Sequence, residues 1–157
     1  KESDVELIGY NTDWIGFTES FKELIEGHRK ALILGTGGVS KAVKYALDKM
    51  GIENKFVSRS SDFEIMGYYE LSPSVMEEYD VIVNCTPMGM WPETNHCPDI
   101  PYGFLSEKHL LLDVIANPDE TLFMKKGREH GATVKGGKDM LELQAEAAWE
   151  IWDRIGE

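Results

Sequence analysis

The stretch ALILGTGGVSKAV, Ala31–Val43, joins a short apolar run to a glycine-rich turn and then to an amphipathic segment. The turn matches the spacing G-x-G-x-x-G/A with the residues Gly35, Thr36, Gly37, Gly38, Val39 and Ser40. In such a turn the first glycine permits a tight bend, the second lets the backbone approach a pyrophosphate, and the third small residue lets the helix pack on the strand. The free N–H groups at the start of the helix would face the phosphates. The stretch predicts a strand–turn–helix unit that binds a dinucleotide, with a purely structural turn as the alternative.

Outward from this turn, strand-like runs alternate with helix-like segments. Apolar runs that predict buried strands cover 30–35, 55–59, 80–86, 110–115 and 132–137. Helical spacing of apolar residues predicts helices over 12–27, 38–51, 119–131 and 139–155, whereas 60–79 is too irregular to assign. Strands alternating with helices predict a parallel sheet covered on both faces. We therefore expect an α/β protein with a doubly wound, Rossmann-like parallel sheet.

Length and charge restrict the class of protein. The chain has 157 residues, 42% of them hydrophobic, which is enough for one buried core. Its 28 Asp and Glu outweigh 16 Lys and Arg, and a net charge of −12 repels nucleic acid and anionic lipid. No apolar run approaches about 18 residues, and no signal peptide precedes the first predicted element. Two cysteines, Cys85 and Cys97, read as reduced thiols, so we expect a cytoplasmic protein with neither nucleic acid nor a membrane as partner.

The end of the second predicted strand carries a cation. Domains that bind NAD usually place Asp or Glu there to accept from the 2′-OH of the adenosine ribose. This chain has Ser58, Arg59 and Ser60 instead, and a guanidinium pairs well with a 2′-phosphate. The pattern predicts NADP over NAD. Two alternatives stay open: Arg59 could be an ordinary surface arginine, and the nearby Asp62 could weaken the preference.

Polar residues also follow the strand over 80–86. Asn84 and Thr86 stand at its carboxyl end, the edge that faces the ligand crevice of an open α/β sheet, and can offer hydrogen bonds to a ribose. Met88 and Met90 add apolar surface. A loop with a proline turn and core methionines is an equally good interpretation of these residues alone.

A polar cluster precedes the dinucleotide motif. Asn11, Thr12 and Asp13 lie at the predicted start of the helix over 12–27, where an acid is favoured by the helix dipole without any chemistry. Trp149 and Trp152 are interpreted as core or interface anchors. The histidines, at 28, 96, 109 and 130, show no spacing typical of metal ligands, so no metal site is expected.

Five motifs in order make the chain resemble the shikimate dehydrogenase family over nearly its whole length. They are GYNTDWIG at 9–16, GTGG at 35–38, SRS at 58–60 where the family usually has Asn-Arg-Thr, NCTPMGM at 84–90, and GGKDMLELQA at 136–145. The resemblance implies reversible hydride transfer between NADP and shikimate, the reduced product of 3-dehydroshikimate, in aromatic amino acid (chorismate) biosynthesis.

The resemblance also implies roles for individual residues. Asp13 would be a catalytic-site carboxylate that holds a substrate hydroxyl and orients a lysine from a separate substrate domain. Asn11, Thr12 and Gln144 would contact substrate, although a solvated Gln in mid-helix is the commoner case. Cofactor contacts would come from the glycine turn and from Ser58, Arg59, Ser60, Asn84, Thr86, Pro87, Met88, Val114, Gly137 and Met140.

Two departures from the family pattern bear on activity. The family shows Tyr in the pattern D-x-x-Y-x-P, where this chain has Ala116 between Asp113 and Pro118. No lysine here matches the catalytic lysine motif of the family's substrate domain, and the chain starts at Lys1 without an initiator Met. We expect residues 1–157 to be one NADP-binding Rossmann domain, a fragment of a bidomain enzyme that turns over little by itself. Its helices over 12–27 and 139–155 would adjoin the absent N-terminal substrate domain, and a homodimer stays open. The alternatives are a quinate/shikimate dehydrogenase that uses NAD and a non-catalytic nucleotide-binding module.

Overall fold

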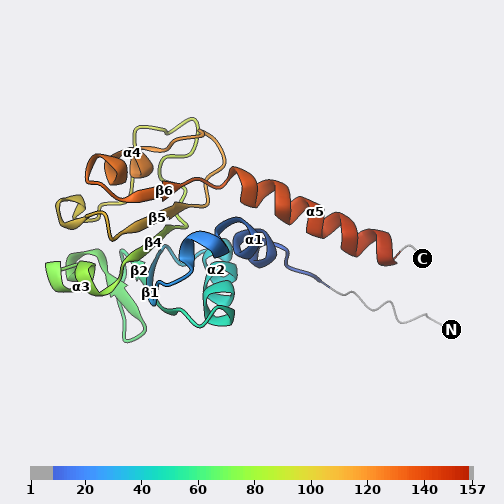
Figure 1. The fold of residues 1–157 in the computed structure, drawn as a ribbon, viewed down its shortest axis with the longest axis horizontal. Helices are drawn as coiled ribbons and strands as arrows, with labels where there is room; N and C mark the ends of the chain where they lie inside the picture. The colour runs from blue at the N-terminus through green and yellow to red at the C-terminus, as the bar shows by residue number, and fades with distance from the viewer. Residues whose placement is uncertain (1–8, 156–157) are drawn as a thin grey trace.

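The computed structural model describes residues 9–155, which form a single six-stranded sheet (Figure 1). All neighbouring strands are parallel, and they lie in the order β3-β2-β1-β4-β5-β6. The strands are β1 (Lys30–Leu34), β2 (Glu53–Ser58), β3 (Ile65–Gly67), β4 (Val81–Asn84), β5 (Leu110–Asp113) and β6 (Thr133–Lys135). This order reverses direction between β1 and β4, as in doubly wound dinucleotide-binding sheets. The predicted fold class is confirmed.

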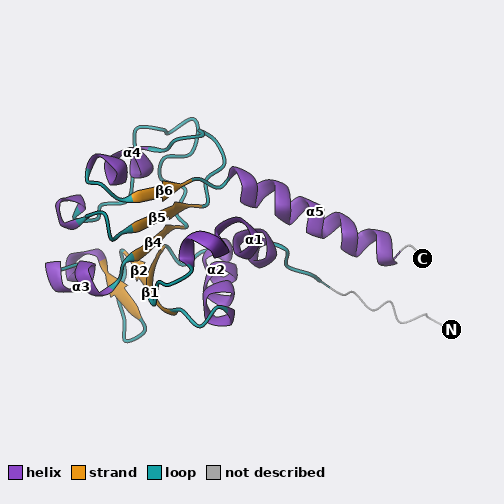
Figure 2. Ribbon diagram, in the orientation of Figure 1, coloured by secondary structure: helices purple, strands orange, loops and turns teal. Residues whose placement is uncertain are grey.

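Helices cover both faces of the sheet (Figure 2). The helices are α1 (Asp13–Ile25), α2 (Gly38–Lys49), α3 (Pro73–Glu78), α4 (Leu122–Glu129) and α5 (Lys138–Ile155), with short 3₁₀ turns η1 (Tyr68–Glu70) and η2 (Tyr102–Phe104). Side chains of α1, α2 and the start of α5 pack on one face, and those of α3 and α4 on the other. The four long predicted helices are confirmed, and the unassigned segment 60–79 contains β3, η1 and α3.

The central strands are apolar throughout because both faces of the sheet are covered. Successive residues of β1 point to opposite sides: Ile33 joins the core under α1 and α2, and Leu34 joins the core under α3 and α4. Strands β4 and β5 are fully buried in the same way. This explains why continuous apolar runs, and not alternating ones, predicted the strands correctly.

Helix α5 lies beside α1 and extends away from the sheet (Figure 1). Trp149 and Trp152 on its outer part are each 68% exposed. The part of our interpretation that placed these two rings in the core is therefore wrong, because most of each side chain is exposed.

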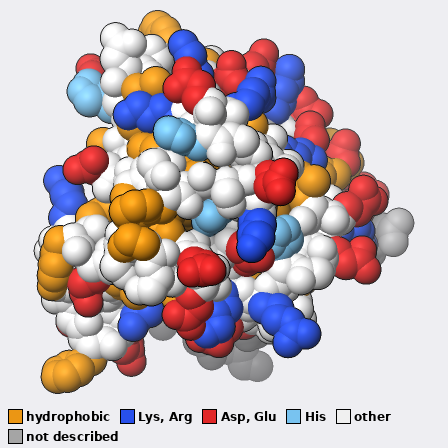
Figure 3. Space-filling view, turned by 60° about the vertical axis from the view of Figure 1, so that its left-hand side comes forward, with side chains coloured by type: hydrophobic (Ala, Val, Ile, Leu, Met, Phe, Trp, Pro, Cys, Tyr) orange, Lys and Arg blue, Asp and Glu red, His pale blue; other side chains and the backbone are white. Residues whose placement is uncertain are grey.

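The surface carries both signs of charge in spite of the acidic excess. Figure 3 shows Lys and Arg side chains interspersed with Asp and Glu over one face of the molecule. Within residues 9–155, no helix is long and apolar enough to cross a membrane.

Candidate functional site

The glycine turn after β1 lies directly against the turn after β4. Gly35 has φ +99°, a left-handed conformation that favours glycine, and its N–H donates to the carbonyl oxygen of Val57 at 2.8 Å. A Cβ on Gly35 would lie 3.2 Å from Cγ2 of Thr86. The sheet order therefore brings two separately predicted turns together where the strand order reverses, the usual ligand position in this kind of sheet.

The start of α2 is open toward this crevice. Gly37 and Gly38 are exposed, and a Cβ on either would meet no protein atom within 4 Å. Ser40 is fully buried, and its hydroxyl donates to the carbonyl oxygen of Gly37 at 2.6 Å, which lets the helix sit close to the strand. The first N–H groups of this 12-residue helix have no partner within the helix, so the arrangement fits a bound phosphate.

Arg59 stands immediately beyond the end of β2 and is exposed, as is Ser60, while Ser58 is the last strand residue. Burial raises the pKa of the Tyr68 hydroxyl, and the positive charge of Arg59 opposes that rise. The carboxylate of Asp62 accepts from the N–H groups of Glu64 and Ile65 at 2.8 and 2.9 Å. Asp62 is therefore engaged in its own loop.

The turn after β4 is built around Asn84. This side chain has no exposed surface, and its amide oxygen accepts from the N–H and the hydroxyl of Thr86 at 3.0 and 2.7 Å. Its amide nitrogen donates to the carboxylate of Asp113. Both ends of the amide are used within the protein, so our expectation of a direct hydrogen bond from Asn84 to a ribose needs correction: Asn84 shapes the turn. Pro87 and Met88, by contrast, are exposed.

The remaining expected cofactor residues lie where β5 ends and α5 begins. The Val114 N–H donates to the carbonyl oxygen of Asn84 at 3.2 Å, and the Gly137 N–H donates to that of Ile115 at 3.0 Å. Met140 is 5% exposed and packs in the core with Phe17 of α1 and its neighbours. Its thioether therefore lies mainly against protein, and its contact with the nicotinamide stays a prediction.

The polar cluster before α1 meets the middle of α5. The Thr12 hydroxyl makes no cap on its own helix and instead donates to Oε1 of Gln144 at 3.1 Å, across 132 positions of sequence. Asn11 Oδ1 accepts from the N–H of Asp13 at 3.0 Å, which fixes the entry into the helix. Among residues 9–155 the amide nitrogen of Gln144 has no protein acceptor, so its two hydrogens are free for a ligand.

Close packing of the two helices makes this meeting possible. A Cβ on Gly16 would lie 2.5 Å from the carbonyl oxygen of Met140 and 2.8 Å from Cβ of Gln144, so only glycine allows the helices to approach this closely. Beside this contact is a hollow of about 440 Å³. Its lining consists of Tyr10, Thr12, Gln144, Ala145, Ala148, Ile151 and Trp152.

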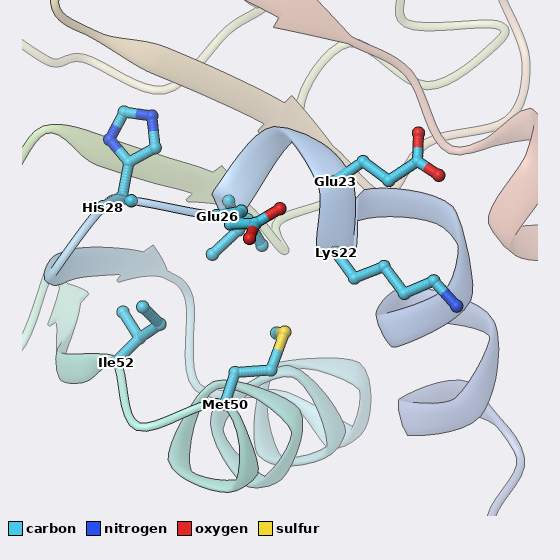
Figure 4. A pocket seen from close by; sticks show the side chains of 8 residues that line it. Lys22, Glu23, Glu26, His28, Met50 and Ile52 are labelled. Atoms are coloured by element: carbon cyan, nitrogen blue, oxygen red, sulfur yellow. The ribbon is translucent and has the colours of Figure 1, made fainter.

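A second hollow, of about 490 Å³, lies near the amino ends of β1 and β2, at the opposite end of the strands from the crevice (Figure 4). Met50 and Ile52 face it, while the charged end of Lys22 and the ring of His28 extend away from it. It contains none of the residues that the sequence singled out, and its charged rim is mainly acidic, which is unsuited to a phosphate ligand.

Asp113, to which the sequence analysis gave no role, is a buried acid beside the crevice. Burial raises the pKa of the Asp113 carboxyl, while donors from Thr121, Ile115 and Asn84 oppose the rise. Burial, and then the charge of Asp113, raise the pKa of the Cys85 thiol, so this thiol is protonated and unreactive at neutral pH. The available signal was the acid that ends the apolar run LLLD at 110–113. Among residues 9–155, no three His, Cys, Asp or Glu side chains are grouped to hold a metal ion.

Comparison with known proteins gives consistent relatives. No family model matches the chain. An NADP⁺-dependent shikimate dehydrogenase of Caldanaerobacter subterraneus subsp. tengcongensis is 35% identical over 163 residues, which cover 93% of this chain and 58% of that protein. A chorismate mutase/shikimate 5-dehydrogenase fusion protein of Clostridium acetobutylicum matches in structure with a TM-score of 0.78 and 36% identity, over 93% of this chain and 55% of that one. A shikimate dehydrogenase in complex with NADP⁺ matches with a TM-score of 0.79 and 28% identity, over 97% of this chain and 59% of that one. The chain thus spans a little over half the length of these relatives.

Proposed function

The chain belongs to the shikimate dehydrogenase family, and from this premise we propose that it is the NADP-binding domain of an enzyme that interconverts shikimate and 3-dehydroshikimate. The observation that carries the proposal is the meeting of the glycine turn with the Thr86 turn between β1 and β4. Of the relatives named above, one is NADP⁺-dependent and another was solved in complex with NADP⁺, which supports the same cofactor here. The reaction would belong to aromatic amino acid (chorismate) biosynthesis.

Each part of the crevice would hold one part of the cofactor. The open N–H groups at Gly37 and Gly38 would bind the pyrophosphate, and Arg59 with Ser58 and Ser60 would bind the 2′-phosphate of the adenosine half. The exposed Pro87 and Met88 would line the nicotinamide half together with the backbone at Val114 and Gly137. When bound, the nicotinamide supplies a hydride acceptor for an alcohol or a hydride donor for a ketone.

Selectivity for the phosphorylated cofactor rests on Arg59. Its guanidinium can form a bidentate pair with a 2′-phosphate, while NAD offers it only a hydroxyl. The acid nearest in sequence, Asp62, accepts from two backbone N–H groups of its own loop and so competes less for a ribose hydroxyl. This favours NADP over the alternative of an NAD-using quinate/shikimate dehydrogenase.

The substrate side would lie at the junction of α1 and α5. Gln144 is oriented by the Thr12 hydroxyl so that its amide nitrogen is free to donate to a substrate oxygen. Asp13, whose backbone is fixed by Asn11, would hold a substrate hydroxyl and orient a lysine from elsewhere in the enzyme for proton transfer. A domain that binds only nucleotide has no use for this arrangement, although Ala116 favours the alternative of a non-catalytic nucleotide-binding module.

The rest of such an enzyme would dock on the outer part of α5. Residues 1–157 would form one domain of this enzyme. Trp149 and Trp152 on α5 are exposed, and the hollow beside Thr12 and Gln144 continues along the same helix. Large exposed apolar groups of this kind mark an interaction surface. A substrate domain seated there would close the hollow over the substrate and supply the lysine.

Calorimetric titration of the chain with NADPH and then NADH tests the proposal. We expect binding of both with NADPH clearly preferred. The matched control is Gly37→Asp: position 37 is the N-cap of α2, where Asp is well tolerated, and its side chain would occupy open space. This variant should fold normally and lose both ligands because its carboxylate repels the pyrophosphate. A folded wild-type chain that binds neither ligand would rule out the proposed cofactor site.

A further inference from the structure

The carboxylate of Asp113 is fully buried and is surrounded only by donors. It accepts from Nδ2 of Asn84 at 3.2 Å to each oxygen, from Oγ1 of Thr121 at 2.6 Å and from the N–H of Ile115 at 3.0 Å. No Lys, Arg or His pairs with it among residues 9–155. Burying an acid without a cation costs stability, so a carboxylate kept here calls for a reason beyond core packing.

The first consequence of this carboxylate is the orientation of Asn84. Because Asp113 can only accept when it is ionised, the Asn84 nitrogen must face it, and the Asn84 oxygen must then face Thr86. That oxygen accepts from the N–H and the hydroxyl of Thr86, and the Thr86 hydroxyl in turn accepts from the Met88 N–H at 3.3 Å. The same Asn84 nitrogen approaches the carbonyl oxygen of Met88 at 3.4 Å. The conformation of the whole Thr86–Met88 turn thus depends on the acceptor at position 113.

The second consequence is that distant segments are tied to the same carboxylate. Thr121 begins α4, where its hydroxyl also accepts from the Met124 N–H at 3.3 Å. Ile115, whose N–H donates to Asp113, accepts through its carbonyl oxygen from Gly137 at the start of α5. The tips of β4 and β5 and the starts of two helices are therefore joined at one edge of the sheet.

We infer that Asp113 is a positioning residue for the nicotinamide half of the cofactor site, acting through Asn84 to hold the Thr86–Met88 turn. The inference rests on the proposed function. The adenosine half is served by other elements, the start of α2 and Arg59 beyond β2. Loss of the acceptor at 113 should therefore weaken binding of a whole dinucleotide and leave an adenosine fragment unaffected.

The test is Asp113→Asn, measured with NADPH and with 2′,5′-ADP, which represents only the adenosine half. An amide at 113 places a donor against the Asn84 nitrogen, so we expect NADPH affinity to fall about tenfold or more and 2′,5′-ADP affinity to stay within about twofold. Thr121→Val, which removes one donor and keeps the carboxylate and the shape, should act in the same direction more weakly. Thr121→Val also tests the inference if Asp113→Asn does not fold. The matched control is Asp80→Asn. Asp80 immediately precedes β4, at the amino ends of the strands and away from the crevice, and its carboxylate pairs with Nδ1 of His28 at 2.7 Å. This variant should bind both ligands as the wild type does.

Amide hydrogen exchange without any ligand separates this inference from the proposed function. In both variants the N–H groups of Thr86 and Met88 should exchange faster, with no matching change at the buried amides of β1. If the wild type binds no NADPH, the proposed function fails while exchange still tests the positioning role. Unchanged exchange and unchanged NADPH affinity would overturn the inference. So would an equal loss of both ligands with a lowered unfolding temperature, because that is the result of a general structural role.

Discussion

At the scale of the residue, Arg59 is where cofactor choice is decided. We predict that Arg59→Ala weakens NADPH binding by roughly 1.5–3 kcal/mol, about tenfold to a hundredfold, because one charge-assisted bidentate contact is lost. NADH binding should barely change. Calorimetry with both cofactors measures this. The control is Arg29→Ala, which removes an exposed arginine just before β1, at the amino ends of the strands. An equal loss of affinity for NADPH and NADH would show that Arg59 does not bind the 2′-phosphate.

The buried Asp113 should also leave a signature in stability against pH. Its folded pKa is raised above the ordinary 3.8, so the native state keeps the proton over a range in which the unfolded chain has lost it. Stability from this group is therefore present at low pH and is lost as pH rises from about 4 through the folded pKa. Urea unfolding of wild type and Asp113→Asn across pH should show the difference moving against the wild type as pH rises, then levelling. A difference that moves toward the wild type would mean that the three donors outweigh burial.

At the scale of the element, the pairing of α1 with α5 depends on a single small residue. Gly16→Ala gains roughly 1 kcal/mol of helix propensity but forces a Cβ to 2.5 Å from a backbone oxygen, and overpacking of this kind costs roughly 1–3 kcal/mol. We expect a net loss of unfolding free energy, together with weaker substrate contacts because Gln144 is displaced. The control is Gly103→Ala, where the new Cβ meets nothing within 4 Å. Gly16→Ala with wild-type stability would contradict the close approach of these helices.

Elements also differ in how far the sequence predicts them. The strands β1, β4 and β5 were predictable because a short continuous apolar run is stable where both faces of the strand are buried. That is the case in the middle of a parallel sheet with helices on both faces. Residues 60–79 were not, since β3 has three residues and α3 six, too short for either periodicity to show. Tertiary contacts stabilise these short elements: β3 pairs with β2, and Met76 of α3 is buried in the core.

At the scale of the whole molecule, α5 carries two large aromatic side chains, Trp149 and Trp152, that residues 9–155 leave mostly exposed. Replacing both Trp149 and Trp152 by Ala should change the free energy of unfolding by less than about 0.5 kcal/mol for each, because both rings are exposed. Phe21→Ala, which empties a fully buried position on α1, should cost roughly 3–5 kcal/mol in the same urea titration. A loss of more than about 2 kcal/mol for the tryptophan pair would mean that they stabilise this chain itself and would argue against a docking surface.

The sequence by itself determined the sheet apart from β3, the glycine turn and the cation beyond β2. These follow from local patterns: apolar runs, the backbone freedom of glycine and the residue at the end of a strand. It also indicated Asn11, Thr12, Asp13 and Gln144, but only through resemblance to a family. The tertiary structure alone decided that Thr12 meets Gln144, that Asn84 and Met140 are turned into the protein, and that Asp113 joins four segments. The physical reason is that hydrogen bonds between residues far apart in sequence depend on which strands become neighbours, and burial depends on what covers them. Neither is a property of any single stretch of the chain.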